Sequence, residues 1–204
     1  MVRVKICGMT NREDAYDAAS LGVQALGFIF APSPRQITPE TAKAVIETLP
    51  PFVTTVGVFV NERLKAVKEI RAYCGFDLVQ LHGDESPHMC ASLMPNVIKA
   101  FQLKDTSSLT ALETYVGKVR AFLFDTYSKK EKGGTGQTFD WNLAVQGKRH
   151  GVPLILSGGL NPDNVKEAIK ATAPFAVDVG SGVEERPGKK DAEQMSRLMK
   201  ALAS

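Results

Sequence analysis

Eight short apolar runs recur along this chain, and each is followed by a segment with helical spacing of its apolar residues. The runs cover residues 2–6, 25–30, 54–60, 77–81, 97–101, 119–124, 153–156 and 175–179. Eight strand–helix units in 204 residues come to about 25 residues each, near the short end for an eight-stranded parallel barrel. The alternation therefore predicts an α/β fold, a single (β/α)8 barrel (TIM barrel) over residues 1–204, with an open doubly wound sheet as the alternative.

Capping residues mark the expected helix starts. Three of them stand directly before a proline, a residue favoured at the first helical position: Thr38, Ser86 and Asn161. Thr10 with Glu13 forms a capping-box pattern. We further expect Asn61 to cap the helix after the third run, and a last helix over about residues 190–202.

Charge and composition narrow the kinds of partner. The net charge of +3 is mildly basic and its residues are scattered, which argues against a nucleic-acid surface and suits an anionic small molecule. The chain has no run of about 18 apolar residues and its N-terminus has no signal-peptide pattern, so we expect a cytoplasmic protein, not a membrane protein. The charge is compatible with a monomer or a homodimer.

The cysteines and histidines give no sign of a metal or a disulfide framework. The three cysteines are an odd number without metal-type spacing, and the three histidines are not clustered. Cys74 and Cys90 fall in or after helical segments and are interpreted as packing residues. We therefore expect no metal and no cofactor.

Two glycine loops near the C-terminus predict a phosphate site. The stretches PLILSGGLNPDNV (153–165) and FAVDVGSGVE (175–184) each run from an apolar strand into glycines. Gly158, Gly159, Gly180 and Gly182 let backbone N–H groups approach phosphate oxygens, and a helix after the first loop adds its positive dipole end. In a (β/α)8 barrel, this is where a phosphate site is commonly found.

Cys7 and Asp125 each end a predicted strand and are candidates for acid–base chemistry. Alternation in VRVKIC points Lys5 and Cys7 into the barrel, so that Lys5 could supply the positive potential that an active thiol needs. Asp125 ends the sixth strand. Because strands one and six are three positions apart in a ring of eight, the two side chains could act on one substrate from opposite sides.

Further candidates follow other strands. Arg35, in APSPRQI, could bind a carboxylate in a bidentate fork. His82 could contact a substrate or be a hydrogen-bonded core residue, and Asp178 could orient a substrate group or pair with an inward lysine such as Lys5 or Lys99. The glycine-rich segment 128–138 could form a mobile cover over the site.

The motifs together resemble a known family. KICGMT, GFIFAPSPR, VGVFVN, VQLHGDE, GGTGQTFDW after Asp125, LSGGLNPDNV and DVGSGVEERPGKKD occur in the order found in phosphoribosylanthranilate isomerases of tryptophan biosynthesis, from residue 3 to about 191. The resemblance implies a (β/α)8 barrel without cofactor or metal. It implies an Amadori rearrangement of N-(5-phosphoribosyl)anthranilate, a small phosphorylated substrate.

The same resemblance implies a role for individual residues. Cys7 would be the general base, Asp125 the general acid and Arg35 the ligand of the anthranilate carboxylate. Phosphate or covering-loop contacts would come from the following residues: Gly134, Gly136, Gly158, Gly159, Gly180, Ser181 and Gly182. Gly180 departs from the family pattern, in which a serine is more frequent, and this leaves open which side chain contacts phosphate there.

Three other functions stay open from the sequence. One is a different sugar-phosphate enzyme on this barrel, such as an epimerase or a relative of indole-glycerol-phosphate synthase. Another is a catalytically silent phosphosugar-binding protein, which would be expected to have lost Cys7 or Asp125. The third is an isomerase that also accepts the related phosphoribosyl aminoimidazole substrate of histidine biosynthesis.

Overall fold

Eight parallel strands close into a barrel in the computed structural model, which describes residues 2–103, 106–125 and 141–203. The strands are β1 (Arg3–Cys7), β2 (Ala25–Ile29), β3 (Thr54–Phe59), β4 (Leu78–Leu81), β5 (Val97–Gln102), β6 (Ala121–Asp125), β7 (Leu154–Ser157) and β8 (Ala176–Val179). Each pairs with its successor along the chain, and β8 pairs with β1. The predicted barrel is confirmed, and each predicted strand overlaps an observed one.

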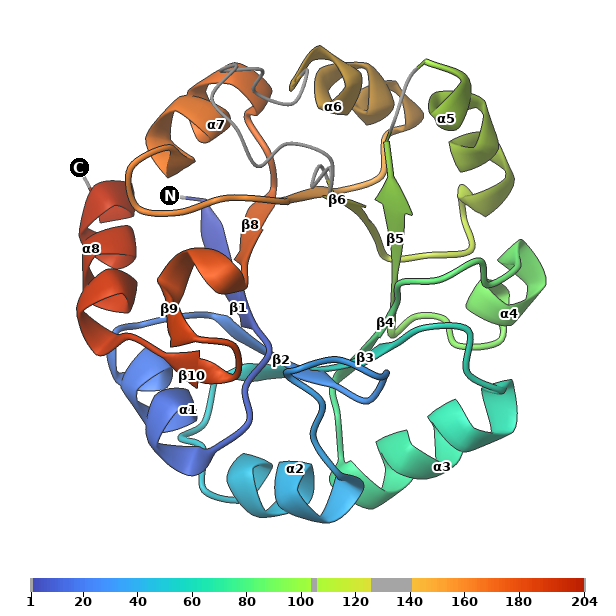
Figure 1. Cartoon of the computed structure of the whole chain (residues 1–204). Coiled ribbons are helices and arrows are strands. Elements are labelled where there is room, and N and C mark those ends of the chain that lie inside the picture. Colours follow the sequence, from blue (N-terminus) through green and yellow to red (C-terminus); the bar gives the residue numbers. More distant parts are fainter. Residues whose placement is uncertain (1, 104–105, 126–140, 204) are drawn as a thin grey trace.

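Helices form an outer ring around the strands (Figure 1). They are α1 (Arg12–Ser20), α2 (Pro39–Ile46), α3 (Leu64–Cys74), α4 (Pro87–Ala91), α5 (Ser107–Thr110), α6 (Trp141–Gly147), α7 (Val165–Thr172) and α8 (Ala192–Ala203). Short 3-10 turns are η1 (Ala111–Tyr115), η2 (Lys148–His150) and η3 (Ser181–Val183), and β9 (Glu184–Arg186) pairs with β10 (Lys189–Lys190) in a small hairpin. The hairpin follows η3, and Lys190 of β10 contacts Cys7 at the C-terminal end of β1.

Two of the predicted helix starts are confirmed at the expected residue. The Thr38 hydroxyl accepts a hydrogen bond from the Thr41 amide at 3.2 Å, and the Ser86 hydroxyl accepts one from Met89 at 3.3 Å. In both cases a proline occupies the first turn, where its missing N–H costs nothing.

Three predicted caps were wrong, because another residue caps the helix or the predicted side chain bonds elsewhere. Asn11, not Thr10, caps α1 by accepting from the Asp14 amide at 2.9 Å. The Asn161 side chain accepts from the amides of Asp163 and Asn164, so it closes a turn and α7 starts only at Val165. The third, Asn61, has φ of +54° and accepts from the Asp84 amide, which fixes the loop after β4 instead of α3.

The barrel wall separates two apolar cores. Inside it, six buried side chains form one cluster: Ile98, Ala100, Ala121, Leu123, Ile155 and Ala176. The alternate strand residues, such as Ile6, Phe28 and Phe122, pack outward against the helices in a larger cluster. This inside–outside alternation is the reason that residues two apart on one strand reach the same compartment.

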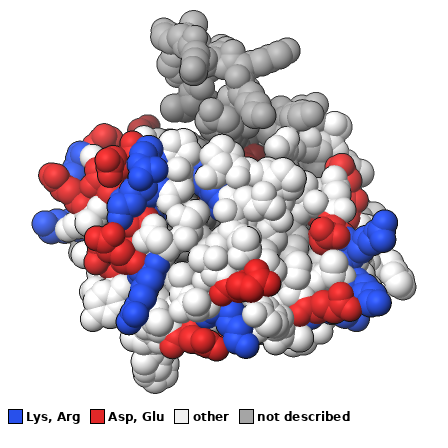
Figure 2. Space-filling model, turned by 60° about the horizontal axis from the view of Figure 1, so that its bottom comes forward, with Lys and Arg blue, Asp and Glu red and all other residues white. Residues whose placement is uncertain are grey.

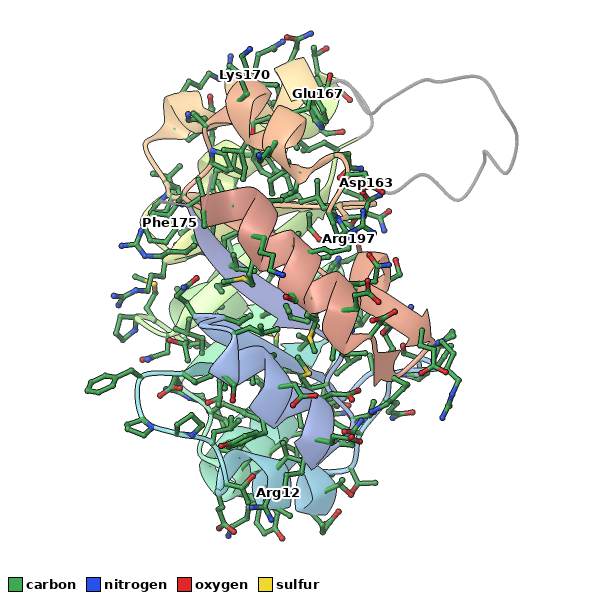
Figure 3. All side chains as sticks on the ribbon, turned by 90° about the vertical axis from the view of Figure 1, so that its left-hand side faces the viewer. Arg12, Asp163, Glu167, Lys170, Phe175 and Arg197 are labelled. Carbon is green, nitrogen blue, oxygen red and sulfur yellow. The ribbon has the colours of Figure 1, made fainter. Side chains whose placement is uncertain are left out.

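The outer helices are joined by ion pairs in places. Arg197 of α8 contacts Asp163, in the turn before α7, with 2.7 Å between its Nη2 and the carboxylate Oδ1 (Figure 3). On the face shown in Figure 2, acidic and basic side chains are interspersed among uncharged ones. The described segments contain no helix that is both long and apolar enough to cross a membrane.

Candidate active site

Cys7 lies at the C-terminal end of β1 and points into the barrel, as the sequence predicts. Its Sγ is packed against Gly27 of β2, where an added Cβ would lie only 2.8 Å from the sulfur. The same hypothetical Cβ would lie 3.2 Å from Cε of Lys5. Gly27 therefore makes the room in which the thiol and the lysine side chain lie next to each other.

Lys5 forms a buried ion pair with Asp178, across the neighbouring strands β1 and β8. The distance from Nζ to Oδ1 is 2.9 Å, and both side chains are almost fully buried. Burial alone would lower the pKa of Lys5, but Asp178 and the neighbouring Cys7 outweigh it and the pKa is raised. Of the two lysines considered as partners of Asp178, the structure selects Lys5.

Lys99 does not point into the barrel, which corrects the alternative pairing. Its neighbours Ile98 and Ala100 occupy the inner face of β5, so Lys99 faces the helices. There its ammonium contacts Glu85 at 3.2 Å and donates to the Gly83 carbonyl at 2.6 Å. This lysine supports the loop after β4 and takes no part in the inner cluster of charges.

The thiol of Cys7 is held mainly in its protonated form in this structure. Burial raises its pKa, and Lys5 and Lys190 oppose that rise without cancelling it. Cys74 and Cys90 are buried away from the strand ends, and burial raises the pKa of each to about 11. Cys7 is distinguished from them by its place at the end of β1 beside the buried Lys5–Asp178 pair, not by a lowered pKa.

Asp125 ends β6, three strands from β1 around the ring. Its Oδ2 lies 3.2 Å from Nε2 of His82, which follows β4. The other ring nitrogen of His82, Nδ1, lies 3.0 Å from the side-chain amide nitrogen, Nε2, of Gln80. The structure therefore brings together two predicted residues, Asp125 and His82, and adds Gln80, which the sequence analysis did not single out.

Arg35 lies directly over the backbone next to Cys7. Gly8 has φ of +85°, and a Cβ on it would lie 2.7 Å from Cδ of Arg35. The guanidinium donates from Nε and Nη2 to Glu184 of β9, at distances of 2.6–3.0 Å. Glycine at position 8 is therefore favoured for two reasons: its φ is left-handed, and the Arg35 side chain occupies the space that a Cβ would need.

Lys190 ties the β9–β10 hairpin to the barrel. Its buried ammonium donates to the Cys7 carbonyl at 2.6 Å, to the Gly180 carbonyl at 3.2 Å and to Glu184 at 2.8 Å. Burial lowers the pKa of Lys190, and Glu184 counteracts only part of this effect. Burial by itself would raise the pKa of Glu184, but hydrogen bonds from Arg35 and Lys190 outweigh it and the pKa is lowered.

The two glycine loops touch each other. Gly182, in η3, packs so closely on the backbone of Leu160 and Asn161 that a Cβ there would overlap the Leu160 carbonyl. Gly158 and Gly159 have φ of +95° and +64°, which puts both in the left-handed region. The loops after β7 and β8 therefore form one continuous backbone surface at the C-terminal end of the barrel.

Gly180 is the exception among these glycines. A Cβ on it would meet only the Cys7 carbonyl, at 3.8 Å, an ordinary contact. Its backbone does not require glycine, so a serine could occupy this position. Ser181 lies in η3 between the two glycines. Gly134 and Gly136 lie outside the described residues.

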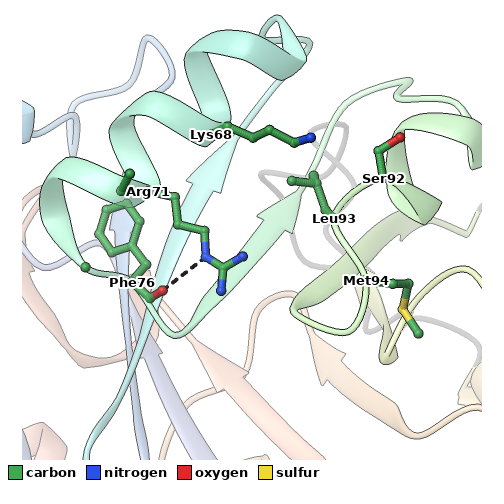
Figure 4. A pocket seen from close by; sticks show the side chains of 8 residues that line it. Lys68, Arg71, Phe76, Ser92, Leu93 and Met94 are labelled. Carbon is green, nitrogen blue, oxygen red and sulfur yellow. Dashed lines mark hydrogen bonds between the residues drawn. The ribbon is translucent and has the colours of Figure 1, made fainter.

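Two hollows on the surface lie at the N-terminal end of the strands, opposite to Cys7 and Asp125. One of about 440 Å³ is lined by Lys68, Arg71 and Phe76 on one side and by Ser92, Leu93 and Met94 on the other (Figure 4). Arg71 donates to the Phe76 carbonyl at 3.2 Å. These residues precede β4 and β5, at the end that stabilises such barrels and does not carry their chemistry.

Over the described stretches, no three His, Cys, Asp or Glu side chains are grouped as metal ligands.

The fold and the strand-end residues together define a (β/α)8-barrel enzyme. The model of the N-(5'-phosphoribosyl)anthranilate isomerase family matches residues 4–201. The chain is 52% identical over 201 residues to the N-(5'-phosphoribosyl)anthranilate isomerase of Geobacter metallireducens, with 98% of each chain covered. This protein therefore belongs to the N-(5'-phosphoribosyl)anthranilate isomerase family.

Solved structures agree with this assignment. The phosphoribosyl anthranilate isomerase of Thermotoga maritima is 43% identical, with a TM-score of 0.92 and coverage of 100% of this chain and 99% of that one. A second structure, of such an isomerase in complex with reduced 1-(o-carboxyphenylamino)-1-deoxyribulose 5-phosphate, is 41% identical with a TM-score of 0.89. It covers 100% of this chain and 99% of the other.

Sequence reasoning missed four residues that shape the site: Gly27, Gln80, Glu184 and Lys190. Gln80 had a usable signal, since it lies two residues before His82 and so on the same face of β4. Glu184 and Lys190 lie in the quoted motif DVGSGVEERPGKKD, but no local pattern pairs them with Arg35 and Cys7, which are far away in the chain.

Proposed function

We propose that this protein isomerises N-(5'-phosphoribosyl)anthranilate to 1-(2-carboxyphenylamino)-1-deoxyribulose 5-phosphate in tryptophan biosynthesis, with Asp125 as general acid and Cys7 as general base. The carrying observation is the placement of these two side chains at the ends of β6 and β1, three strands apart in the closed ring. The complex of the 41% identical relative with a reduced form of this product supports the substrate class. Such a biosynthetic role makes the cytoplasm the expected compartment.

The acid step opens the ribose ring. Asp125 gives a proton to the furanose ring oxygen, the bond from that oxygen to C1 breaks, and the nitrogen lone pair forms the C1 iminium. The imidazole of His82, 3.2 Å from Oδ2, is placed to stabilise the carboxylate that remains. This assigns His82 to the acid side of the reaction, where we expect it to contact the substrate as well.

The base step forms the enolamine. The iminium makes the C2 proton acidic, and the Cys7 thiolate removes it, leaving a C1–C2 double bond. Protonation at C1 and loss of the C2 hydroxyl proton then give the ketone, so that no net proton is gained or lost. The Lys5 and Lys190 ammonium groups would favour the thiolate that this step requires.

Three groups would hold the substrate. Arg35 binds the anthranilate carboxylate, and its place over Gly8 puts that carboxylate next to Cys7. The loops containing Gly158, Gly159, Gly180, Ser181 and Gly182 bind the phosphate through backbone N–H groups. Asp178, fixed by Lys5, faces the barrel interior and is expected to orient a substrate hydroxyl or the amine. Contacts from Gly134 and Gly136 stay a prediction.

Turnover of phosphoribosylanthranilate, with a metal chelator present, tests this function in the wild type, Cys7→Ser and Asp125→Asn. We expect chelator-insensitive isomerisation that falls by about 10²–10⁴-fold in each variant, with thermal unfolding nearly unchanged. Cys74→Ser is the matched control and should keep full activity.

Two outcomes would contradict the proposal. A folded wild type that binds the product analogue without turnover would favour a silent phosphosugar-binding protein. Wild-type turnover in Asp125→Asn or Cys7→Ser would leave the isomerase activity but remove that residue from its role.

A further inference from the structure

Gln80 is a buried polar side chain inside the barrel, where its surroundings are otherwise mostly apolar. It is 1% exposed and lies on the inner face of β4, between Leu78 and His82. Leu78 packs against the apolar cluster that fills the barrel interior. An amide in such a place costs free energy unless it is hydrogen-bonded. The Gln80 side chain therefore needs a hydrogen-bond partner, and among the described residues it has one in His82.

The bond between Gln80 and His82 determines which ring nitrogen carries the proton. Asp125 Oδ2 lies 3.2 Å from Nε2, and an unprotonated oxygen there, in a carboxylate or in an acid with its proton on Oδ1, pairs with an N–H donor. A neutral imidazole with its proton on Nε2 has a lone pair on Nδ1. The amide nitrogen of Gln80, 3.0 Å from Nδ1, donates to that lone pair.

The opposite orientation of the Gln80 amide would give a different form of the ring. Oε1 is buried and has no hydrogen-bond partner among the described residues. Rotating the amide by half a turn would place Oε1 against Nδ1 and would require an Nδ1–H. The ring would then be either an imidazolium or a neutral tautomer with a bare Nε2 facing Asp125. Both forms change what Asp125 can do with its proton.

We propose that Gln80 is a positioning residue for the acid: it fixes the His82 tautomer that donates to Oδ2 of Asp125, so that the transferable proton is carried on Oδ1. This inference rests on the proposed role of Asp125 as general acid. With Oδ2 already accepting from the imidazole, a proton on Oδ1 is the one that can go to the ring oxygen.

Two variants of Gln80 separate positioning from packing. Gln80→Glu keeps the size of the side chain but accepts a proton from Nδ1, so it selects the wrong tautomer or the imidazolium. Gln80→Met keeps the shape without selecting either form. We expect kcat to fall by about 10–100-fold in Gln80→Glu, with KM changed less than about twofold, and to fall less in Gln80→Met.

Nitrogen NMR of the imidazole gives a readout that does not depend on activity. The chain has three histidines, so spectra of His88→Gln and His150→Gln identify the signals of His82. We expect the wild-type ring to be neutral with its proton on Nε2, and the Gln80→Glu ring to carry a proton on Nδ1.

The outcomes distinguish this inference from the proposed function. A wild-type His82 with its proton on Nδ1, or full kcat in Gln80→Glu beside an inactive Asp125→Asn, would overturn the inference and leave the acid role intact. Loss of the acid role itself would show as wild-type turnover in Asp125→Asn. If Gln80→Glu fails to fold, the wild-type spectrum and the kcat of Gln80→Met still decide the question.

Discussion

Glu184 occupies one edge of the Arg35 guanidinium. Its carboxylate accepts from Nε at 2.8 Å and from Nη2 at 2.6 Å. A guanidinium has a second bidentate edge, formed by its two terminal nitrogens. Because Glu184 holds only the first edge, Arg35 is fixed in direction and can still present the second edge to a carboxylate.

Replacing Arg35 tests that second edge. We expect Arg35→Ala to weaken binding of the product analogue by about 10–100-fold, while binding of inorganic phosphate changes little. Isothermal titration with each ligand measures the two losses. Arg12→Ala, at an exposed arginine of α1, is the matched control. Equal losses for both ligands would contradict a specific carboxylate contact.

Glu184 also gives stability a defined pH dependence. Its pKa is lowered from an ordinary 4.5, so its ionised form stabilises the fold above that pH, and this contribution is lost as the pH falls through the lower folded value. Glu184→Gln should lose about 1.5–3 kcal/mol at neutral pH, and its difference from the wild type should shrink below pH 4.5. Urea unfolding at several pH values measures this.

The matched control for this pH effect is Glu13→Gln. Glu13 pairs with Lys189, but its side chain is 77% exposed, so its contribution should stay within about 0.5 kcal/mol. A difference between Glu184→Gln and the wild type that is constant from neutral to acid pH would show that the charge of Glu184 contributes nothing.

Substitutions at Gly182 and Gly180 test the contact between the two glycine loops, with Gly180 as the matched control. An alanine at Gly182 would overlap the Leu160 carbonyl, so the two loops would have to separate. We expect Gly182→Ala to destabilise the protein by about 1–3 kcal/mol and to raise KM. Gly180→Ser should leave both nearly unchanged, because its Cβ meets only the Cys7 carbonyl at 3.8 Å. Thermal unfolding and steady-state kinetics give both quantities, and a reversed order would contradict the loop contact.

The raised pKa of Cys7 predicts how its reactivity changes with pH. Only the thiolate reacts with iodoacetamide, and burial disfavours the thiolate more than the two lysines favour it. The alkylation rate should therefore still be rising well above about pH 8.5, the ordinary value for a cysteine. Mass spectrometry of peptides containing Cys7 measures the rate, with Cys7→Ser as the blank.

Ligand protection makes the alkylation test specific to the site. A bound product analogue should slow modification of Cys7 and leave Cys74 and Cys90 unaffected. A rate that levels off below pH 8 would mean that the thiolate is already formed near neutrality, contrary to the raised pKa.

The sequence by itself predicted eight strand–helix units and the residues at the strand ends. Apolar runs of period two and helices of period 3.6 repeat eight times, which favours a barrel over an open doubly wound sheet, and a closed ring then sets which strands lie opposite. The inward direction of Cys7 and the start of α2 at Thr38–Pro39 follow from the same local rules. The family motifs then predicted the reaction, an Amadori rearrangement, and the residues expected to take part in it.

Only the tertiary structure decided which charged and polar groups pair. Lys5 and Lys99 were equal candidates for Asp178, and they were separated by the face of the strand that each occupies. The pairing of Arg35 with Glu184 joins residues 149 positions apart. Long-range pairs depend on the register of strands and the course of loops, and no local pattern in the sequence records either of these.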